Sequence, residues 1–308
     1  MLEIAGGLVI GLLVGSFLNV VIYRLPVMLE RSWREECQEF LTAQASMHGP
    51  EIADSGVVAS EVADKAEPQA AFNLLVPRSA CPGCGAQITA LQNIPVISWL
   101  VLRGRCAACS QPIPARYPAV ELLTGVLSAL VIWHFGWNPS GWVILPFLWT
   151  LIALTFIDFD HQLLPDDLTY PLLWSGLALS ALNSTGLLPV ALPLPELPAS
   201  VFGAIAGYLS LWSVYQLFKL ITGKEGIGYG DFKLLAALGA WLGYGMLPLV
   251  IMLSAVVGAV AGTAMIISLG RDRQIPIPFG PYLAGAGFIA MLWGETIVGA
   301  YLNFSGLA

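Results

Sequence analysis

Long segments without charged residues recur along this 308-residue chain. No Asp, Glu, Lys or Arg occurs between Leu122 and Ile157 or between Leu234 and Gly270. Because the hydrocarbon core of a bilayer is about 30 Å thick, a spanning helix needs about 20 apolar residues. Only 11% of the residues are charged, against about 25% in soluble domains. The sequence therefore excludes an ordinary soluble globule and predicts an all-α polytopic membrane protein.

Turns and Pro-rich connectors divide the apolar segments into about eight predicted transmembrane helices. The first lies at Ile4–Tyr23, two flank the turn at Gly136–Gly141, two flank the Pro-rich connector at 188–198, two (the first of them short) lie between Leu234 and Gly270, and the last is Pro281–Ala300. The first segment is long, interrupted by glycines and has no small-residue cleavage site before Arg24. It is therefore expected to be a retained span rather than a cleaved signal peptide.

The basic residues predict how these spans are oriented. With eight spans, all thirteen Lys and Arg fall in the connectors that follow odd-numbered spans. Cytosolic loops carry such an excess, so both termini are expected outside and these connectors in the cytosol. The net charge is −7, and no clustered basic stripe is available for a nucleic-acid groove, so no nucleic-acid partner is expected.

Residues 24–117 form the one long polar segment, a predicted cytosolic insertion between the first span (1–23) and a seven-helix membrane domain (118–308). A short helix is possible over Trp33–Leu41, and Cys37–Ala71 is expected to be accessory.

The insertion contains two Cys-x-x-Cys pairs, Cys81 with Cys84 and Cys106 with Cys109. Two such pairs can supply the four sulfurs of a tetrahedral zinc site. The alternatives are two disulfides or four unrelated thiols, and a cytosolic location argues against disulfides. We therefore predict structural zinc within residues 81–109, because four thiolates leave no open coordination position. Cys37 has no such partner in the pattern.

Two acidic residues at the edges of apolar segments are candidate catalytic groups. Asp158 ends one apolar run and Asp231 begins another, both on the predicted cytosolic side. Acids at such positions are costly and therefore functional candidates. Two carboxylates brought together can share a proton and activate water against a peptide bond, as in aspartyl proteases. Three further acids, Asp160, Asp166 and Asp167, are expected in solvated loop, helix-cap or substrate-contact positions.

Two other function classes fit some of these features. A proton- or ion-coupled transporter would use Asp158 and Asp231 as relay groups, but it predicts acids on broken helices near mid-bilayer. A non-catalytic assembly platform would use the zinc module to bind a partner. The clustering of the acids at one surface favours chemistry on a cytosolic substrate.

Seven motifs, in this order, resemble the type IV prepilin peptidases over nearly the whole chain. They are Gly15–Pro26, the paired cysteine knuckles, Asn93–Val96, Arg116–Thr124, Asp158–Asp166, Gly228–Lys233 and Pro276–Tyr282. The resemblance implies a bacterial inner-membrane enzyme that cleaves the leader of type IV prepilins and type II secretion pseudopilins at the cytosolic face. It also implies methylation of the new N-terminal residue from S-adenosylmethionine.

The resemblance maps the family's aspartyl pair onto Asp158 and Asp231 and its metal cysteines onto Cys81, Cys84, Cys106 and Cys109. The S-adenosylmethionine site is implied by the resemblance alone, since no Gly-rich strand-to-helix turn is visible. The segment 42–72 and the connector near 188–198 depart from the family pattern. Neither overlaps a motif, so partner contacts rather than chemistry are expected to differ.

Overall fold

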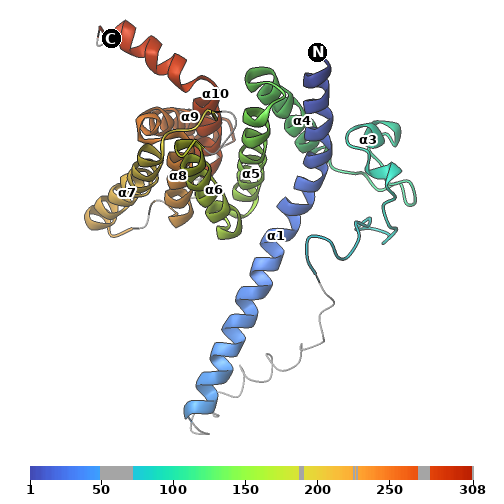
Figure 1. The fold of residues 1–308 in the computed structure, drawn as a ribbon. Helices are drawn as coiled ribbons and strands as arrows, with labels where there is room; N and C mark the ends of the chain where they lie inside the picture. The colour runs from blue at the N-terminus through green and yellow to red at the C-terminus, as the bar shows by residue number, and fades with distance from the viewer. Residues whose placement is uncertain (49–71, 187–190, 225, 227, 270–277, 307–308) are drawn as a thin grey trace.

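The computed structural model describes residues 1–48, 72–186, 191–224, 226, 228–269 and 278–306. Eight long helices make up most of these ranges (Figure 1): α1 (Leu2–His48), α4 (Arg116–Phe135), α5 (Pro139–His161), α6 (Asp166–Ser184), α7 (Leu197–Thr222), α8 (Tyr229–Leu242), α9 (Leu247–Leu269) and α10 (Gly280–Ser305). The short elements are η2 (Leu91–Asn93), α3 (Ile97–Val101) and η3 (Tyr244–Met246). The described residues form no strand beyond two isolated bridges, so the predicted all-α fold is confirmed.

The eight long helices coincide with the eight predicted spans, but the span count of eight is not confirmed. Among the described residues, six helical segments are long and apolar enough to cross a membrane, and they involve α1, α4, α5, α7, α9 and α10. At 14 residues, α8 measures about 21 Å, which is shorter than the hydrocarbon core. It is an inner helix rather than an independent span.

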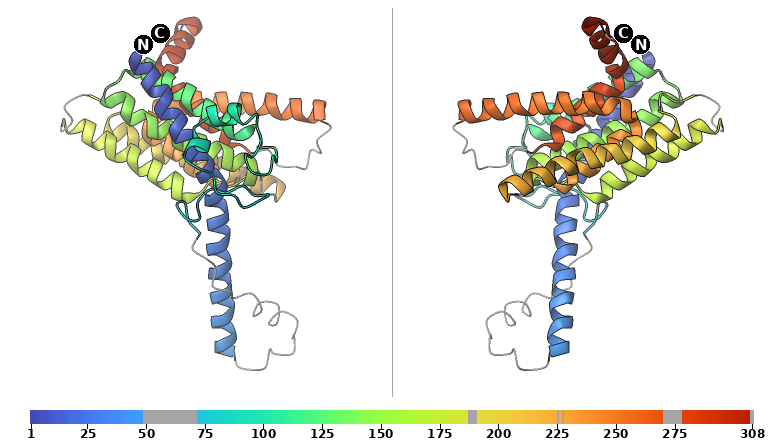
Figure 2. Two further views of the ribbon diagram at one scale, coloured as in Figure 1. Left: turned by 90° about the vertical axis from the view of Figure 1, so that its right-hand side faces the viewer. Right: turned by 90° about the vertical axis from the view of Figure 1, so that its left-hand side faces the viewer.

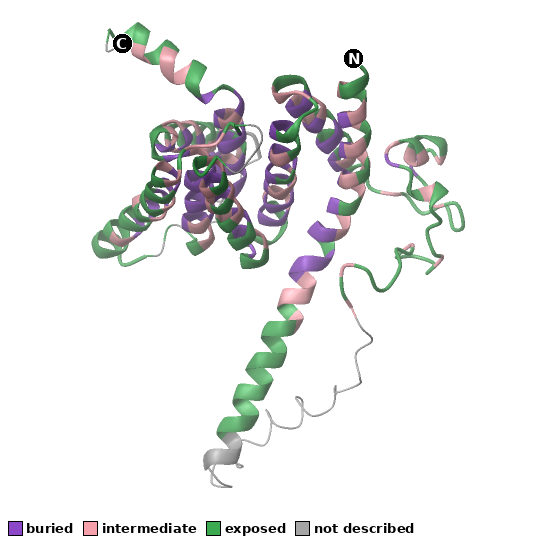
Figure 3. Cartoon of the chain, viewed as in Figure 1, coloured by how far each residue is buried: buried purple, intermediate pink, exposed green. Residues whose placement is uncertain are grey.

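The first helix continues well beyond Tyr23. It passes through Pro26 and ends at His48, so the possible helix at Trp33–Leu41 is part of a much longer one. Figures 1 and 2 show this extension projecting away from the other helices, with a change of direction from the membrane part. A proline inside a helix removes one backbone hydrogen bond and commonly causes such a bend. Its surface is exposed from Ser32 to Gln44 (Figure 3). The rest of the predicted accessory segment, 49–71, lies outside the described residues.

Glycines allow α1 to pack directly on α4. Gly7, Gly11 and Gly15 are spaced at intervals of four on α1. A Cβ at Gly11 would lie 2.5 Å from Ser128 Oγ, and one at Gly15 would lie 2.8 Å from the Cα of Glu121. In lipid, where apolar area gives no advantage to helix association, such close backbone approach supplies the packing energy. This interface fixes α4, and with it the insertion that leads into α4.

The short helix α8 lies at the centre of the second group of helices. Its side chains are almost all buried, with Phe232, Leu234, Leu235 and Leu238 fully enclosed. Helix α7 touches it backbone to backbone, because a Cβ at Gly239 would collide with the carbonyl oxygen of Gly203. On the α6 side, the Trp241 indole donates a 2.7 Å hydrogen bond to the Leu172 carbonyl. Surrounding helices thus hold α8, and the acid at its start, in a defined position.

Both termini lie at the same end of the molecule, and the α1 extension points the opposite way (Figures 1 and 2). This arrangement agrees with an even number of membrane crossings.

Three of the thirteen basic residues, Lys65, Arg271 and Arg273, lie outside the described residues.

Candidate functional site

Asp158 lies in the last turn of α5 and is only 5% exposed. Its Oδ2 accepts a 3.0 Å hydrogen bond from the amide of Gly280, the first residue of α10. The first amides of a helix have no intrahelical partner, and the helix dipole favours negative charge there. The start of α10 therefore orients the Asp158 carboxylate.

Asp231 lies in the first turn of α8 and is 8% exposed. Gly228 precedes this helix, and a Cβ there would lie 3.6 Å from Asp231 Oδ2. The carboxylates of Asp231 and Asp158 are close enough to interact electrostatically. The two acids therefore lie near each other although they come from different helices.

Leu164, in the turn between α5 and α6, packs between the two helix starts. A Cβ at Gly230 would lie 2.7 Å from Leu164 Cβ, and one at Gly280 would lie 3.1 Å from Leu164 Cδ2. Only glycine at these two positions lets the starts of α8 and α10 approach Leu164 this closely. The glycines thus bring both acids to one place.

Such a pair has a defined chemical capability. Two nearly buried carboxylates repel each other, so sharing one proton between them is less costly than full ionisation of both. The ionised member can accept a proton from water and the protonated member can donate one. The pair titrates as a unit, so neither role belongs permanently to one residue.

Ion pairs flank the two acids and account for two of the remaining carboxylates. Asp160 pairs with Arg116 through both carboxylate oxygens, joining α5 to α4. Lys233 Nζ lies 2.6 Å from Asp166 Oδ1, joining α8 to α6. Asp167 is exposed in the first turn of α6. These three acids therefore lie in inter-helix and helix-start positions outside the pair.

The four predicted metal cysteines converge in one cluster. Their sulfur atoms all lie within 4.8 Å of one another, and Cys81 Sγ lies 3.8 Å from Cys109 Sγ. The two loops have the same construction: the residue after each second cysteine has a positive φ and donates its amide to the first cysteine's carbonyl at 2.9 Å. These residues are Gly85 and Ser110. The four-cysteine cluster could therefore hold a metal ion.

The backbone of the second loop favours ionised sulfur. Hydrogen bonds from the amides of Cys109 and then Ala108 lower the pKa of the Cys106 thiol to about 6. At Cys109 the Gln111 amide also favours the thiolate, but the sulfurs of Cys84, Cys106 and Cys81 and desolvation together outweigh it and raise the pKa to about 12. Four crowded sulfurs cannot all ionise easily unless a cation stabilises them, which suits a metal-binding cluster.

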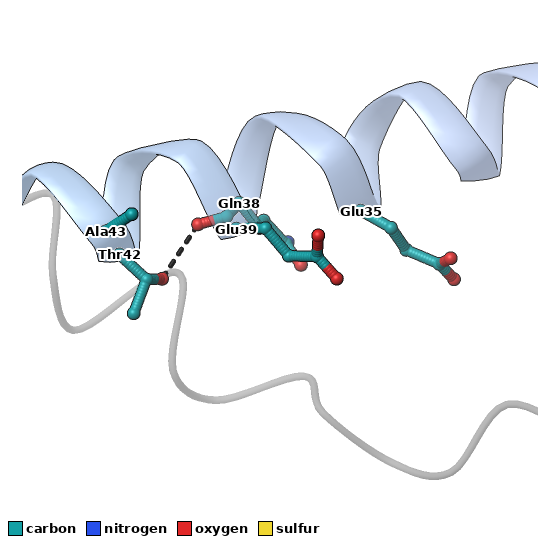
Figure 4. A pocket seen from close by; sticks show the side chains of 5 residues that line it. All are labelled: Glu35, Gln38, Glu39, Thr42 and Ala43. Carbon is teal, nitrogen blue, oxygen red and sulfur yellow. Dashed lines mark hydrogen bonds between the residues drawn. The ribbon is translucent and has the colours of Figure 1, made fainter.

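A separate surface hollow lies on the α1 extension and is lined by Glu35, Gln38, Glu39, Thr42 and Ala43 (Figure 4). The Thr42 hydroxyl donates to the Gln38 carbonyl within the helix at 2.7 Å. This is an ordinary i to i−4 bond. The hollow shares no residue with the aspartate pair or the cysteine cluster, and it is not part of either site.

Sequence reasoning ranked Asp158 and Asp231 first but assigned no role to Gly280 or Leu164. Gly280 lies inside the Pro276–Tyr282 motif, so a signal was present. Its contact with Asp158 joins residues that are distant in sequence and becomes visible only in the fold.

Two family models cover most of the chain. The Bacterial Peptidase A24 N-terminal domain matches residues 9–135, and the Type IV leader peptidase family matches residues 145–263. The second match contains both acids and the first contains all four clustered cysteines. The chain belongs to the type IV leader peptidase family.

Relatives agree with this assignment over almost their full length. Proteins named prepilin leader peptidase/N-methyltransferase are 53% identical in Stutzerimonas stutzeri (97% of this chain, 94% of the relative) and 50% identical in Pseudomonas aeruginosa (97% and 93%). The Aeromonas hydrophila protein of the same name is 50% identical over 98% of both chains. No solved structure matches the chain significantly. Family and relatives give no support to the transporter interpretation.

Proposed function

We propose that this membrane protein is an aspartyl endopeptidase that removes the leader peptide of type IV prepilins and type II secretion pseudopilins, and that it then methylates the new N-terminal amine. The observation that carries the peptidase activity is that Asp158, at the end of α5, and Asp231, at the start of α8, are both nearly buried around the same residue, Leu164. The names of the relatives support the substrate class and the second activity.

In the proposed peptidase step, water lies between Asp158 and Asp231. The ionised carboxylate accepts a proton from this water while the water oxygen bonds to the scissile carbonyl carbon. The protonated carboxyl group donates to the carbonyl oxygen, which gives a neutral tetrahedral intermediate. Collapse of this intermediate breaks the C–N bond, and the leaving amine takes up a proton from the pair. The Gly280 amide keeps the Asp158 carboxylate oriented throughout.

We place this chemistry at the cytosolic face of the bacterial inner membrane. Arg116 and Lys233 form their ion pairs beside the two acids, and Lys219 lies in the last turn of α7. Basic residues concentrate on the cytosolic side of membrane proteins. A pilin helix that enters laterally from the bilayer would present its leader junction at this surface.

We propose zinc as the metal of the four-cysteine cluster. Tetrahedral zinc with Zn–S bonds of about 2.3 Å requires sulfur atoms about 3.8 Å apart, and Cys81 and Cys109 have a 3.8 Å separation. Cys81, Cys84, Cys106 and Cys109 would hold the ion. Four sulfur ligands fill the tetrahedral shell, so the metal would stabilise the module and take no part in peptide cleavage.

The proposed methyl donor is S-adenosylmethionine, which supplies an electrophilic methyl group for the new N-terminal amine. The described residues form no sheet, and therefore no donor site of the soluble methyltransferase kind, with a Gly-rich turn between a strand and a helix. We assign no residue to the donor.

A single reconstitution tests both activities. The full chain in proteoliposomes is mixed with a pilin precursor, with and without S-adenosylmethionine, and the products are weighed by mass spectrometry. We expect one cut at the leader junction in both samples and an added methyl group only with the donor. An intact precursor would contradict the peptidase assignment, and cleavage without methylation would contradict the second activity alone.

A further inference from the structure

The module that carries the cysteine cluster, residues 72–115, exposes apolar side chains around α3. We call them the α3 patch: Leu91, Ile94, Ile97, Leu100 and Val101, which are 78, 39, 59, 61 and 75% exposed. Ile97, Leu100 and Val101 share one face of α3, since they lie three and four positions apart. Contiguous exposed apolar side chains usually mark an interaction site.

The other face of α3 is used for the module's own packing. The Trp99 indole donates a 3.1 Å hydrogen bond to the Ile113 carbonyl, and a Cβ at Gly104 would lie 2.9 Å from the Trp99 ring. The short helix thus has an inward aromatic side and an outward aliphatic side. The outward residues face away from the module although the module is folded around Trp99.

The patch is held next to a membrane helix. The amide of Val96, between Ile94 and Ile97, donates a 2.8 Å hydrogen bond to Glu121 Oε2 on α4. Glu121 lies five residues after Arg116, the first residue of that helix, which is about 7.5 Å along the axis. Figure 1 shows α3 beside α1 and α4 and far from the tip of the α1 extension.

The same turns of α4 carry side chains suited to lipid contact. Leu122, Leu123 and Val126 are 50, 41 and 51% exposed within a candidate membrane span. The Val96–Glu121 hydrogen bond therefore ties the α3 patch to turns of α4 whose apolar side chains a bilayer must cover. With the bilayer surface taken at the start of α4, the Val96 contact would lie about 7.5 Å deep, within the 5–10 Å at which interfacial elements bury their apolar faces.

The charge of the module also suits a lipid surface. Residues 72–115 contain Arg78, Arg103 and Arg105 and no Asp or Glu, although the whole chain has a net charge of −7. All three arginines are exposed. Basic groups beside an apolar insertion are attracted to anionic headgroups. The α1 extension differs, because its four Glu (30, 35, 36 and 39) outnumber its three Arg (24, 31 and 34) and because it projects away from the other helices.

We propose that the cysteine module lies on the bilayer, with the α3 patch buried at the headgroup boundary and its arginines among anionic lipid phosphates. The occupant of the patch is lipid, rather than a second copy of the chain or another protein. The module is then held by the bilayer as well as by its contacts with α1 and α4. This membrane contact does not depend on the peptidase activity.

The test uses the full chain in nanodiscs made from equal parts of phosphatidylcholine and phosphatidylglycerol. A benzophenone amino acid replaces Leu100, and irradiated protein is analysed for lipid and protein adducts. Val126 on α4 is the lipid-facing reference, and Phe40 on the α1 extension, 63% exposed, is the matched exposed control. We expect lipid adducts at position 100 in a yield similar to position 126 and several-fold above position 40.

Position 97 is labelled in parallel, and bound metal per chain shows that each labelled protein retains a folded module. Adducts with a second chain at position 100, or no lipid adduct there while position 126 reacts, would overturn the proposal. Replacing Arg103 and Arg105 with Gln should lower the share of phosphatidylglycerol among the adducts at position 100. An unchanged share would overturn the headgroup contact.

Discussion

Replacing Gly280 with Ala tests whether the start of α10 holds Asp158 in its working position. The new Cβ would lie 2.6 Å from Asp158 Oδ2, whereas ordinary contacts begin near 3.4 Å. The carboxylate must therefore shift by about 0.8 Å, or α10 must move away and weaken the 3.0 Å hydrogen bond. A misplacement of about 1 Å in a catalytic site costs about 10²-fold in rate, or about 2.7 kcal/mol.

The assay is the rate of cleavage of a pilin precursor in proteoliposomes under saturating substrate. The matched control is Gly285→Ala on the same helix, because a Cβ at Gly285 meets nothing within 4 Å. We expect the control to cleave at the normal rate and to be stabilised by up to about 1 kcal/mol through alanine's helix propensity. A normal rate for a folded Gly280→Ala protein would refute the positioning of Asp158 by α10.

Two further predictions concern packing and metal binding. Gly11→Leu should separate α1 from α4, because a Cβ alone would lie 2.5 Å from Ser128 Oγ. We expect a loss of about 1–3 kcal/mol, seen as a lower unfolding temperature in detergent, and no such loss for Gly299→Leu, whose site is open. Cys84→Ser should abolish stoichiometric metal by elemental mass spectrometry, whereas Cys37→Ser should retain it, since Cys37 is exposed on α1 and outside the cluster. Full metal content in Cys84→Ser would contradict the four-sulfur site.

The sequence was sufficient to place most membrane helices and the cysteine cluster, because both depend on local patterns. Charge-free length determines whether a helix can cross the bilayer, and two Cys-x-x-Cys loops determine four convergent sulfurs. The repeated construction of the loops, with a positive φ at Gly85 and Ser110, became visible only in the structure, because serine does not signal that conformation. The spacing of Gly7, Gly11 and Gly15 was visible in the sequence and was missed.

Tertiary features were beyond local patterns. The α1 extension passes through Pro26, where local rules predict that a helix ends or kinks. Helix α8 is too short to cross the hydrocarbon core of a bilayer. Its role as a buried central helix depends on α6, α7 and α10. Asp158 and Asp231 were ranked by their places at the edges of apolar runs, but no sequence pattern predicts that the Gly280 amide bonds Asp158.

The most direct test of the central claim is cleavage of a pilin precursor by the Asp158→Asn and Asp231→Asn proteins in reconstituted membranes. Asparagine preserves the size of the side chain but can neither accept the proton from water nor share one with its partner. Asp167→Asn, at the exposed start of α6, is the control. Loss of cleavage in both pair variants, with normal membrane insertion, metal content and control activity, is the predicted result. Normal cleavage by either pair variant would contradict the account.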